Sequence, residues 1–273
     1  MSPAADLRVL LTGASGSVGE QLRPLLAADY REVVLNSRKP LAALAANEHW
    51  VGGDICEPGL WDGLLPGVDA VIHLAGVVGP HYTFAETCGP NFTATYELFE
   101  AVRRHGIRRT IYASTHHAVG YLPRDRQVDH ATAPRPDSWY GLTKACGELV
   151  AVHAADRYRL DVMSIRIGYV AATVPDERRL HTWCSPRDLA ALIRLGLTGP
   201  QRGHHLVYGA SDCPEPLFDN AHAASLGYRP QDRALDHLAD PAIAHQRPDP
   251  RLPHQRYIGG HFAVRDDERG TQP

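Results

Sequence analysis

A tyrosine and a lysine in the stretch SWYGLTKACGE, residues 138–148, have the spacing of a proton-transfer pair. Tyr140 and Lys144 are four residues apart, so on a helix they lie on one face. A phenol with an ordinary pKa of about 10 is a weak base at neutral pH, but a nearby ammonium lowers that pKa. Such a pair can exchange a proton with a hydroxyl or a carbonyl while a hydride moves.

The stretch LLTGASGSVGEQL, residues 10–22, indicates the cofactor that would carry the hydride. An apolar run ends at Thr12, glycines follow at 13, 16 and 19, and a helical pattern then begins. Glycines let a backbone turn approach a pyrophosphate, and the helix start offers free N–H groups. As the first strand–turn–helix of the chain, this stretch predicts a dinucleotide site. The expected contacts are Gly13, Ser15, Gly16, Ser17 and Val18.

The stretch LNSRKP, residues 35–40, ends the second strand pattern. An NAD site carries an acid about 20 residues past the glycines, but Ser37 and Arg38 stand here instead. Both can bind a 2′-phosphate, so this corner predicts NADP(H) in preference to NAD(H); the alternative is a solvated basic turn. After the next strand pattern, Asp54 and Ile55 are expected near the adenine, although Asp54 is equally suited to cap a helix.

Small hydroxyls and two histidines end another strand pattern, in YASTHHAVGY, residues 112–121. The carboxyl ends of parallel strands face the ligand crevice of a doubly wound fold. Ser114, Thr115, His116 and His117 are therefore expected near that crevice. The two histidines lack the cysteine or carboxylate spacing of a metal site, so no metal is expected.

Short apolar runs alternate with helical patterns, which predicts an α/β fold with a doubly wound, mostly parallel sheet of Rossmann type. The expected strands cover residues 7–12, 33–35, 49–52, 70–74, 109–114, 161–166 and 204–208. The expected helices cover residues 18–28, 59–64, 91–105, 138–158 and 186–196. We expect one domain over residues 1–265, with a short C-terminal substrate-side subregion, mainly 169–265. It is expected to turn irregular from Asp240 and to fray after about Val264.

The composition is that of an ordinary globular protein and argues against several kinds of partner. The 273 residues are 44% hydrophobic and 22% charged, with a formal net charge of −3. Nothing in this charge suggests nucleic acid or a membrane surface, and no apolar run is long enough to span a bilayer. The five cysteines are scattered and no signal-peptide pattern is present, which predicts reduced thiols and a cytoplasmic location. We expect a small-molecule substrate and a homo-oligomer.

The glycine turn TGxxGxxG, Asn91, the Ser/Thr strand end and the YxxxK pair together resemble the extended, epimerase-like branch of the short-chain dehydrogenases/reductases. Within that branch the chain is similar to uronate dehydrogenases over nearly its whole length. The stretches that carry this likeness are HLAG (73–76), ASTHHAVGYLP (113–123), WYGLTKACGE (139–148), RIG (166–168), RRLHTWCS (178–185), YGASD (208–212), FDNAH (218–222) and RYIGGHF (256–262).

The resemblance implies a role for each residue that matches the catalytic motif. Thr115 would orient the substrate oxygen, and Tyr140 would be the acid/base. Lys144 would bind the nicotinamide ribose, and Asn91 would support that lysine. Further cofactor contacts are expected at Leu74, Ala75, Gly76 and Ile167, beside Tyr140 and Lys144 themselves.

The resemblance also implies a substrate pocket, which departs from the family pattern. Arg178 matches the arginine that grips a uronate carboxylate, and His117 matches a pocket histidine. Val78, His116 and Tyr169 replace a serine, an asparagine and a small polar residue of the family. The expected substrate contacts are Val78, Thr115, His116, His117, Tyr140, Tyr169 and Arg178.

These departures, with the missing cofactor acid, favour an NADP(H)-dependent oxidoreductase that interconverts a carbonyl and a secondary alcohol. The expected substrate is small, polar and sugar-, nucleoside- or cyclitol-like, and the expected reaction is a ketone reduction in biosynthesis. One alternative is a uronate dehydrogenase that oxidises a hexuronic acid to its lactone. Another is a catalytically silent NADP(H)-sensing regulator, which would not need Thr115, Tyr140 and Lys144. A nucleotide-sugar epimerase or dehydratase would need a larger C-terminal region than follows Gly168.

Overall fold

A seven-stranded parallel sheet organises the computed structural model, which describes residues 4–264. The strands are β1 (Arg8–Thr12), β2 (Glu32–Ser37), β3 (Glu48–Gly52), β4 (Ala70–His73), β5 (Arg109–Thr115), β6 (Asp161–Ile167) and β9 (His204–Gly209). They are ordered β3-β2-β1-β4-β5-β6-β9, and every neighbouring pair is parallel. The predicted doubly wound fold and its seven strands are confirmed.

The strand order reverses between β1 and β4, at the centre of the sheet. Val9, Leu10 and Leu11 of β1 are fully buried, because helices cover both faces of a central strand. The next residue, Thr12, is paired with His73 at the carboxyl end of β4. Ligands of open parallel sheets bind outside the carboxyl ends of the strands at such a reversal. The order of the strands therefore points to this edge as the ligand crevice.

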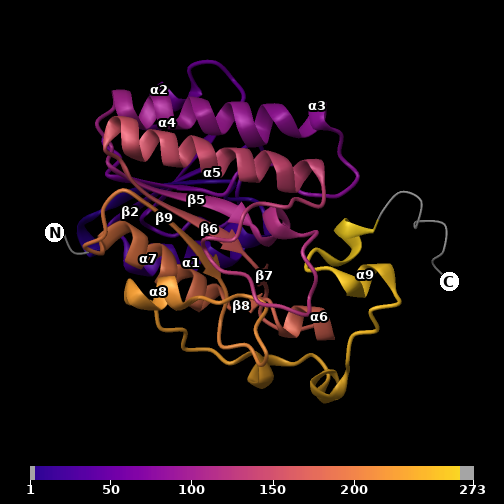
Figure 1. Cartoon of the computed structure of the whole chain (residues 1–273). Helices are drawn as coiled ribbons and strands as arrows, with labels where there is room; N and C mark the ends of the chain where they lie inside the picture. Colours follow the sequence, from indigo (N-terminus) through magenta and orange to yellow (C-terminus); the bar gives the residue numbers. More distant parts are fainter. Residues whose placement is uncertain (1–3, 265–273) are drawn as a thin grey trace.

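Two layers of helices enclose the sheet (Figure 1). One face carries α1 (Ser17–Asp29) and α7 (Pro186–Thr198), and the other carries α2 (Leu60–Leu64), α4 (Ala94–Arg104) and α5 (Trp139–Tyr158). Leu22 of α1 and Leu192 of α7 belong to one buried apolar cluster, whereas Leu98 of α4 and Ala151 of α5 belong to a second. The sheet thus separates two hydrophobic cores. Each predicted helix is present, with ends that differ by a few residues.

The chain after Gly168 contains more regular structure than the sequence predicted. The short strands β7 (Tyr169–Val170) and β8 (Trp183–Cys184) pair in parallel, with α6 (Glu177–Leu180) between them. The same part of the chain also contains α8 (Ala221–Ser225), α9 (Pro253–Arg256) and 3-10 turns at Ala234–His237, Pro241–His245 and Gly260–Ala263. Short pieces before Gly168 are α3 (Phe84–Thr87), a π-helix (Cys88–Thr93) and 3-10 turns at Ala4–Asp6 and His116–Val119. Elements this short show no periodicity in a sequence. Figure 1 shows α6, α9, β7 and β8 gathered at one end of the sheet.

The C-terminal segment is tied to the loop that follows β5. Ile258 N donates to Leu122 O, and Gly259 N donates to Gly120 O, each at 2.9 Å. Ile258 is fully buried. The segment expected to be irregular from Asp240 therefore packs as part of the fold, as short helical pieces joined by loops. The predicted frayed end after Val264 lies outside the described residues, and the single domain over residues 1–265 stays a prediction.

Within residues 4–264, the structure contains no helix with the length and apolar character needed to cross a membrane.

His73, at the end of β4, is buried in the core beneath the ligand crevice. Its Nδ1 is 2.8 Å from Thr12 Oγ1, and its ring lies between those of Trp61 and Tyr112. Burial lowers the pKa of His73 to about 3, and the nearby Lys144 ammonium adds to this effect. The folded state therefore contains the neutral imidazole at neutral pH.

We expect acid to destabilise the fold through His73. In the unfolded chain this imidazole has an ordinary pKa of about 6.5, so the unfolded state takes up its proton first as the pH falls. The stability that depends on neutral His73 is present above about pH 6.5 and is lost progressively toward about pH 3. Urea unfolding between about pH 7 and pH 4 should show a slope up to about 1.4 kcal/mol per pH unit steeper for wild type than for His73→Leu. Parallel pH dependences would contradict this assignment.

Candidate active site

Backbone contacts shape the glycine turn between β1 and α1. Gly13 has a φ of +72°, and a Cβ on it would lie 2.8 Å from Ala75 N. A Cβ on Gly19 would lie 2.4 Å from Gly13 O, so both positions exclude a side chain. Gly16 precedes α1, and no side chain within residues 4–264 caps this helix. The first N–H groups of α1 are thus available to an anion such as a pyrophosphate. Ser15, Ser17 and Val18 lie at the same turn and are at least partly exposed.

The segment that follows β4 packs against this turn. Leu74 N donates to Thr12 O at 3.3 Å, and Ala75 N donates to Thr12 Oγ1 at 3.2 Å. A Cβ on Gly76 would lie 2.7 Å from the Asn91 amide oxygen, so the backbone passes very close to the neighbouring helix. The structure therefore brings the predicted cofactor contacts of β4 to the carboxyl edge, where β6 also ends, at Ile167.

The corner at Ser37 and Arg38 differs from its prediction. The Ser37 hydroxyl donates to Lys39 O at 2.7 Å and accepts from Trp50 Nε1 at 3.0 Å. The Arg38 side chain is 75% exposed, and its Nη1 is 3.8 Å from Asp54 Oδ2. The hydroxyl is therefore already used within the protein, and a carboxylate stands opposite the guanidinium. A 2′-phosphate in this corner would meet that negative charge.

Asp54 forms a local turn rather than a helix cap. Its Oδ1 accepts from Cys56 N at 3.0 Å, whereas the N-cap of α2 is Gly59. The helix-cap alternative for Asp54 is therefore wrong. Ile55 beside it is buried in the core. The contact of these two residues with the adenine stays a prediction.

Tyr140 and Lys144 lie on the first turns of α5 and face the end of β5. The Tyr140 hydroxyl is hydrogen-bonded to Thr115, and Lys144 Nζ lies 4.7 Å from the ring centre of Tyr112. All these side chains are buried. Burial raises the pKa of Tyr140 to about 12, although the bond to Thr115 opposes this shift. Burial lowers the pKa of Lys144 to about 7, against the attraction of Glu148. The lowered phenol pKa that the sequence suggested is thus not found in the protein alone, because desolvation outweighs the other effects.

A buried ion pair holds α5 on the sheet. Glu148 accepts from Arg166 Nε and Nη2 of β6, each at 2.9 Å, and from the Ser114 hydroxyl of β5. Glu148 and Arg166 are only 5% and 2% exposed. Because these contacts join one helix to two strands, they fix where the first turns of α5 stand relative to the strand ends.

Asn91 lies in the π-helix that precedes α4, where the sequence predicted the start of one continuous helix. Its amide binds the backbone of Val77 twice, with Oδ1 accepting at 2.7 Å and Nδ2 donating at 2.9 Å. Nδ2 also lies 3.2 Å from Thr143 Oγ1 on α5. Asn91 therefore joins the loop after β4 to the helix that carries Lys144. The wider π turn is a common device at functional sites.

The two adjacent histidines have different surroundings. His116 Nδ1 is 3.0 Å from Ile167 O, and burial holds its pKa well below the usual range, so it is neutral. His117 Nδ1 is 2.7 Å from a carboxylate oxygen of Asp137. The His117 ring stacks on Phe262 with 3.9 Å between ring centres, and it lies 5.9 Å from the ring centre of Tyr140. The structure thus places His117 beside the Tyr140 ring.

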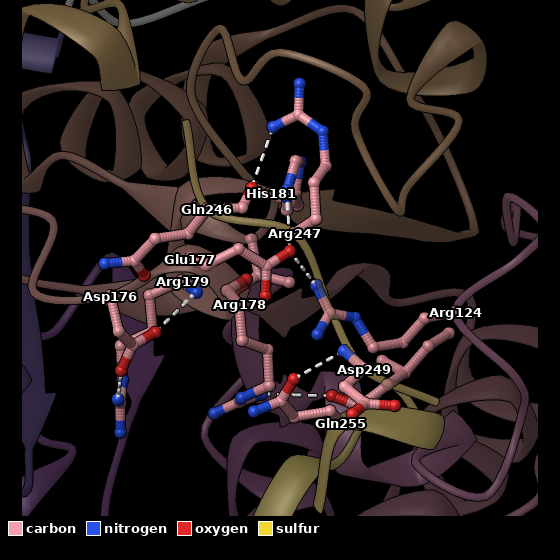
Figure 2. Close-up of polar contacts among 12 residues, drawn as sticks. Arg124, Asp176, Glu177, Arg178, Arg179, His181, Gln246, Arg247, Asp249 and Gln255 are labelled. Carbon is pink, nitrogen blue, oxygen red and sulfur yellow. Dashed lines mark hydrogen bonds and ion pairs between the residues drawn. The ribbon is translucent and has the colours of Figure 1, made fainter. Parts of the chain in front are cut away.

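Arg178 projects from α6 toward the C-terminal segment. Figure 2 shows Glu177 turned toward Arg124 and His181, whereas the Arg178 side chain runs the other way. Arg178 Nη1 donates to Ile258 O at 3.0 Å, and its guanidinium packs against Gly260. Burial lowers the pKa of Arg178 to about 10. Arg178 is therefore held within the protein and is not freely solvated.

The remaining predicted substrate contacts lie at the margins of this group. Val78 is 61% exposed. Tyr169 pairs with Trp183 between β7 and β8, and its ring lies beneath the Arg179 guanidinium at 4.7 Å. Among the residues that the structure describes, no group of three or more His, Cys, Asp or Glu could hold a metal ion.

A parallel sheet with a glycine turn after β1 and a buried Thr–Tyr–Lys group beyond β5 defines a Rossmann-type dehydrogenase. Comparison with known proteins agrees: residues 9–197 match the NAD dependent epimerase/dehydratase family. The chain belongs to this family, and it is an NAD(P)-dependent oxidoreductase of the short-chain dehydrogenase/reductase type that acts on CH–OH groups.

Relatives within the family are similar over nearly the whole chain. A uronate dehydrogenase of Pseudomonas putida is 42% identical over 259 residues, which cover 94% of this chain and 96% of the relative. The structure of a glucuronic acid dehydrogenase from Chromohalobacter salexigens is 33% identical, with a TM-score of 0.89 over 97% of this chain and 99% of the other. A mutant uronate dehydrogenase from Agrobacterium tumefaciens, solved with NAD, is 30% identical, with a TM-score of 0.88 over 96% and 98%.

The predictions of the cofactor and of the reaction are wrong. The preference for NADP(H) is overturned by these relatives, one of which was solved with NAD, and the occupied Ser37 hydroxyl and the Arg38–Asp54 pair explain the error. The biosynthetic ketone reductase is overturned as well, because the relatives match the alternative, a uronate dehydrogenase. His116 and Val78 differ from the family pattern and so suggested another substrate. In the structure, however, His116 is bonded to the backbone of β6 and Val78 faces solvent.

Asp137 and Phe262 both contact His117, but neither was predicted from the sequence. Asp137 stands three residues before Tyr140, and Phe262 ends the RYIGGHF stretch. Because His117 lies 20 residues or more from both in the chain, local sequence patterns could not connect them with it.

We expect Tyr140→Phe to lower turnover by roughly a hundredfold or more, the usual scale for a lost proton donor or acceptor. Affinity for the cofactor, measured by fluorescence titration, should stay nearly unchanged. Tyr158→Phe is the matched control, because it removes a hydroxyl from the far end of the same helix, where Tyr158 donates to Glu100 at 2.6 Å. Turnover of Tyr140→Phe within a few-fold of this control would exclude Tyr140 as the acid/base.

Proposed function

We propose that this protein oxidises a hexuronic acid at C1 to its lactone with NAD. The observation that carries this proposal is the 42% identity to a uronate dehydrogenase over nearly the full length of both chains. The local geometry agrees with it, since a hydrogen-bonded Tyr140–Thr115 pair, His117 and the cationic Arg178 gather at one end of the sheet.

The turn after β1 fits a dinucleotide. A Cβ on Gly13 or Gly19 would collide with backbone, which leaves a bare surface at the start of α1. We propose that the cofactor is held by Gly13, Ser15, Gly16, Ser17, Val18, Ser37, Arg38, Asp54, Ile55, Leu74, Ala75, Gly76, Tyr140, Lys144 and Ile167. When bound, NAD supplies the hydride acceptor and a cationic ring.

Tyr140 accepts the proton of the C1 hydroxyl as the hydride leaves C1. The bond between Tyr140 and Thr115 orients the phenol oxygen toward the reacting group. Because burial raises the pKa of Tyr140, the phenolate needs positive charge nearby. Lys144, on the same face of α5, supplies it when protonated, and Asn91 holds the adjoining loop in place.

Arg178 binds the carboxylate that distinguishes a uronic acid from a neutral sugar. Its guanidinium is already held by Ile258 O, so little side-chain freedom is lost when a carboxylate arrives. His117 contacts a hydroxyl of the sugar ring. Val78, His116 and Tyr169 form the edge of the pocket.

The cytoplasmic location and the homo-oligomer stay predictions of the sequence. The cysteines of the described chain, Cys56, Cys88, Cys146, Cys184 and Cys213, are all free thiols, in accord with a reducing compartment.

An assay of the purified protein with glucuronate and galacturonate, in the presence of NAD or NADP, tests the proposal. We expect NADH formation with at least one uronate and a higher kcat/KM with NAD than with NADP. Glucose is the control substrate, because it lacks the carboxylate. Activity on glucose equal to that on every uronate, or no activity on any uronate, would contradict the proposal.

We expect Arg178→Ala to raise the KM for the uronate far more than it lowers kcat, because a carboxylate contact is made in both ground and transition states. A lost charge-assisted bond corresponds to roughly a ten- to hundredfold change. Arg251→Ala is the control, because it removes the same charge from a side chain that is 89% exposed. Equal KM values for the two variants would show that Arg178 has no carboxylate to bind.

A further inference from the structure

His117 and Asp137 form a buried hydrogen-bonded pair next to Tyr140. The His117 Nδ1 and Asp137 Oδ2 atoms are 2.7 Å apart, and the two side chains are 8% and 0% exposed. A carboxylate can only accept a hydrogen bond, so Nδ1 of His117 carries the proton that joins them. In the neutral imidazole this leaves a lone pair, and no proton, on Nε2.

Three glycines make the room that Asp137 occupies. A Cβ on Gly120 would lie 1.8 Å from Asp137 Oδ2, and a Cβ on Gly259 would lie equally close. A Cβ on Gly141 would lie 3.3 Å from Asp137 Oδ1. These glycines come from the loop after β5, the C-terminal segment and α5. A carboxylate enclosed by backbone from three segments cannot turn away from His117.

Further contacts hold His117 and Asp137 in place. Phe262 stacks on one side of it at 3.9 Å between ring centres, with 23° between the ring planes. His117 N donates to Thr115 Oγ1 at 3.2 Å. Asp137 Oδ1 accepts from Ser138, whose hydroxyl also caps α5 by accepting from Gly141 N. The pair is thus linked both to Thr115 and to the helix that carries Tyr140.

We propose that Asp137 is a positioning residue for the reaction: it fixes the tautomer and the direction of His117, so that Nε2 accepts a hydrogen bond from a hydroxyl of the bound sugar. This inference rests on the proposed function. His116, by contrast, bonds through Nδ1 to Ile167 O, and its Nε2 is buried. Of the two adjacent histidines, only His117 is therefore assigned a hydrogen bond to the substrate.

Asp137→Asn tests this role, because the amide has the same shape but can offer its N–H to Nδ1 and so favour the opposite tautomer. We expect kcat/KM for the uronate to fall about ten- to a hundredfold, the scale of leaving a buried hydrogen-bonding group without its partner. NADH affinity should be unchanged. His117→Ala should have a similar effect, and adding Asp137→Asn to it should cost less than about threefold more, since the two residues act as a unit.

Additive losses in the double variant would overturn the proposal, because they would show that Asp137 acts through the α5 cap rather than through His117. Nitrogen NMR of the imidazoles gives a second readout, with the His117 signals assigned by their absence in His117→Ala. We expect a protonated Nδ1 and a bare Nε2 in wild type, and a shift toward protonated Nε2 in Asp137→Asn. A wild type with protonated Nε2 would overturn the proposal.

The two readouts separate this inference from the proposed function. A wild type that oxidises no uronate contradicts the proposed function, whereas the imidazole signals still decide whether Asp137 sets the tautomer. If Asp137→Asn does not fold, the wild-type spectrum alone gives that decision.

Discussion

The buried contact between Glu148 of α5 and Arg166 of β6 fixes the helix on which the candidate site depends. Two parallel hydrogen bonds join them, and Ser114 of β5 adds a third. Such a pair gains little stability over an apolar core, but losing one partner leaves a buried charge at a cost of about 3–5 kcal/mol. The main effect of the pair is to fix the position of α5 relative to the ends of β5 and β6.

Successive turns of α5 carry the residues of the site. One turn before Glu148, Lys144 faces the loop that Asn91 holds, and another turn earlier Tyr140 meets Thr115 at the end of β5. Just before the helix begins, Asp137 reaches His117. The C-terminal segment covers this group and is bound to the loop after β5 by backbone hydrogen bonds from Ile258 and Gly259.

The sheet, its order of elements and the Tyr140–Lys144 face could be predicted because they rest on local periodicity and spacing. The bonds of Ser37 could not, because its hydroxyl is occupied by Trp50 from the next strand. Nor could Asp137 and Phe262, which meet His117 only after distant segments fold together. The errors about NADP(H) and the substrate have this common cause: residue types were visible, but the partners that already used them were not.

In the proposed reaction, C1 of a uronic acid gives its hydride to NAD in this site. Glucuronate that carries deuterium at C1 tests it most directly, with mass spectrometry of the nicotinamide product and of the sugar. We expect the NADH formed to contain the deuterium, and the sugar to be recovered as the lactone or the acid derived from it. NADH without deuterium, or an oxidised sugar that keeps its label, would exclude hydride transfer from C1 to NAD.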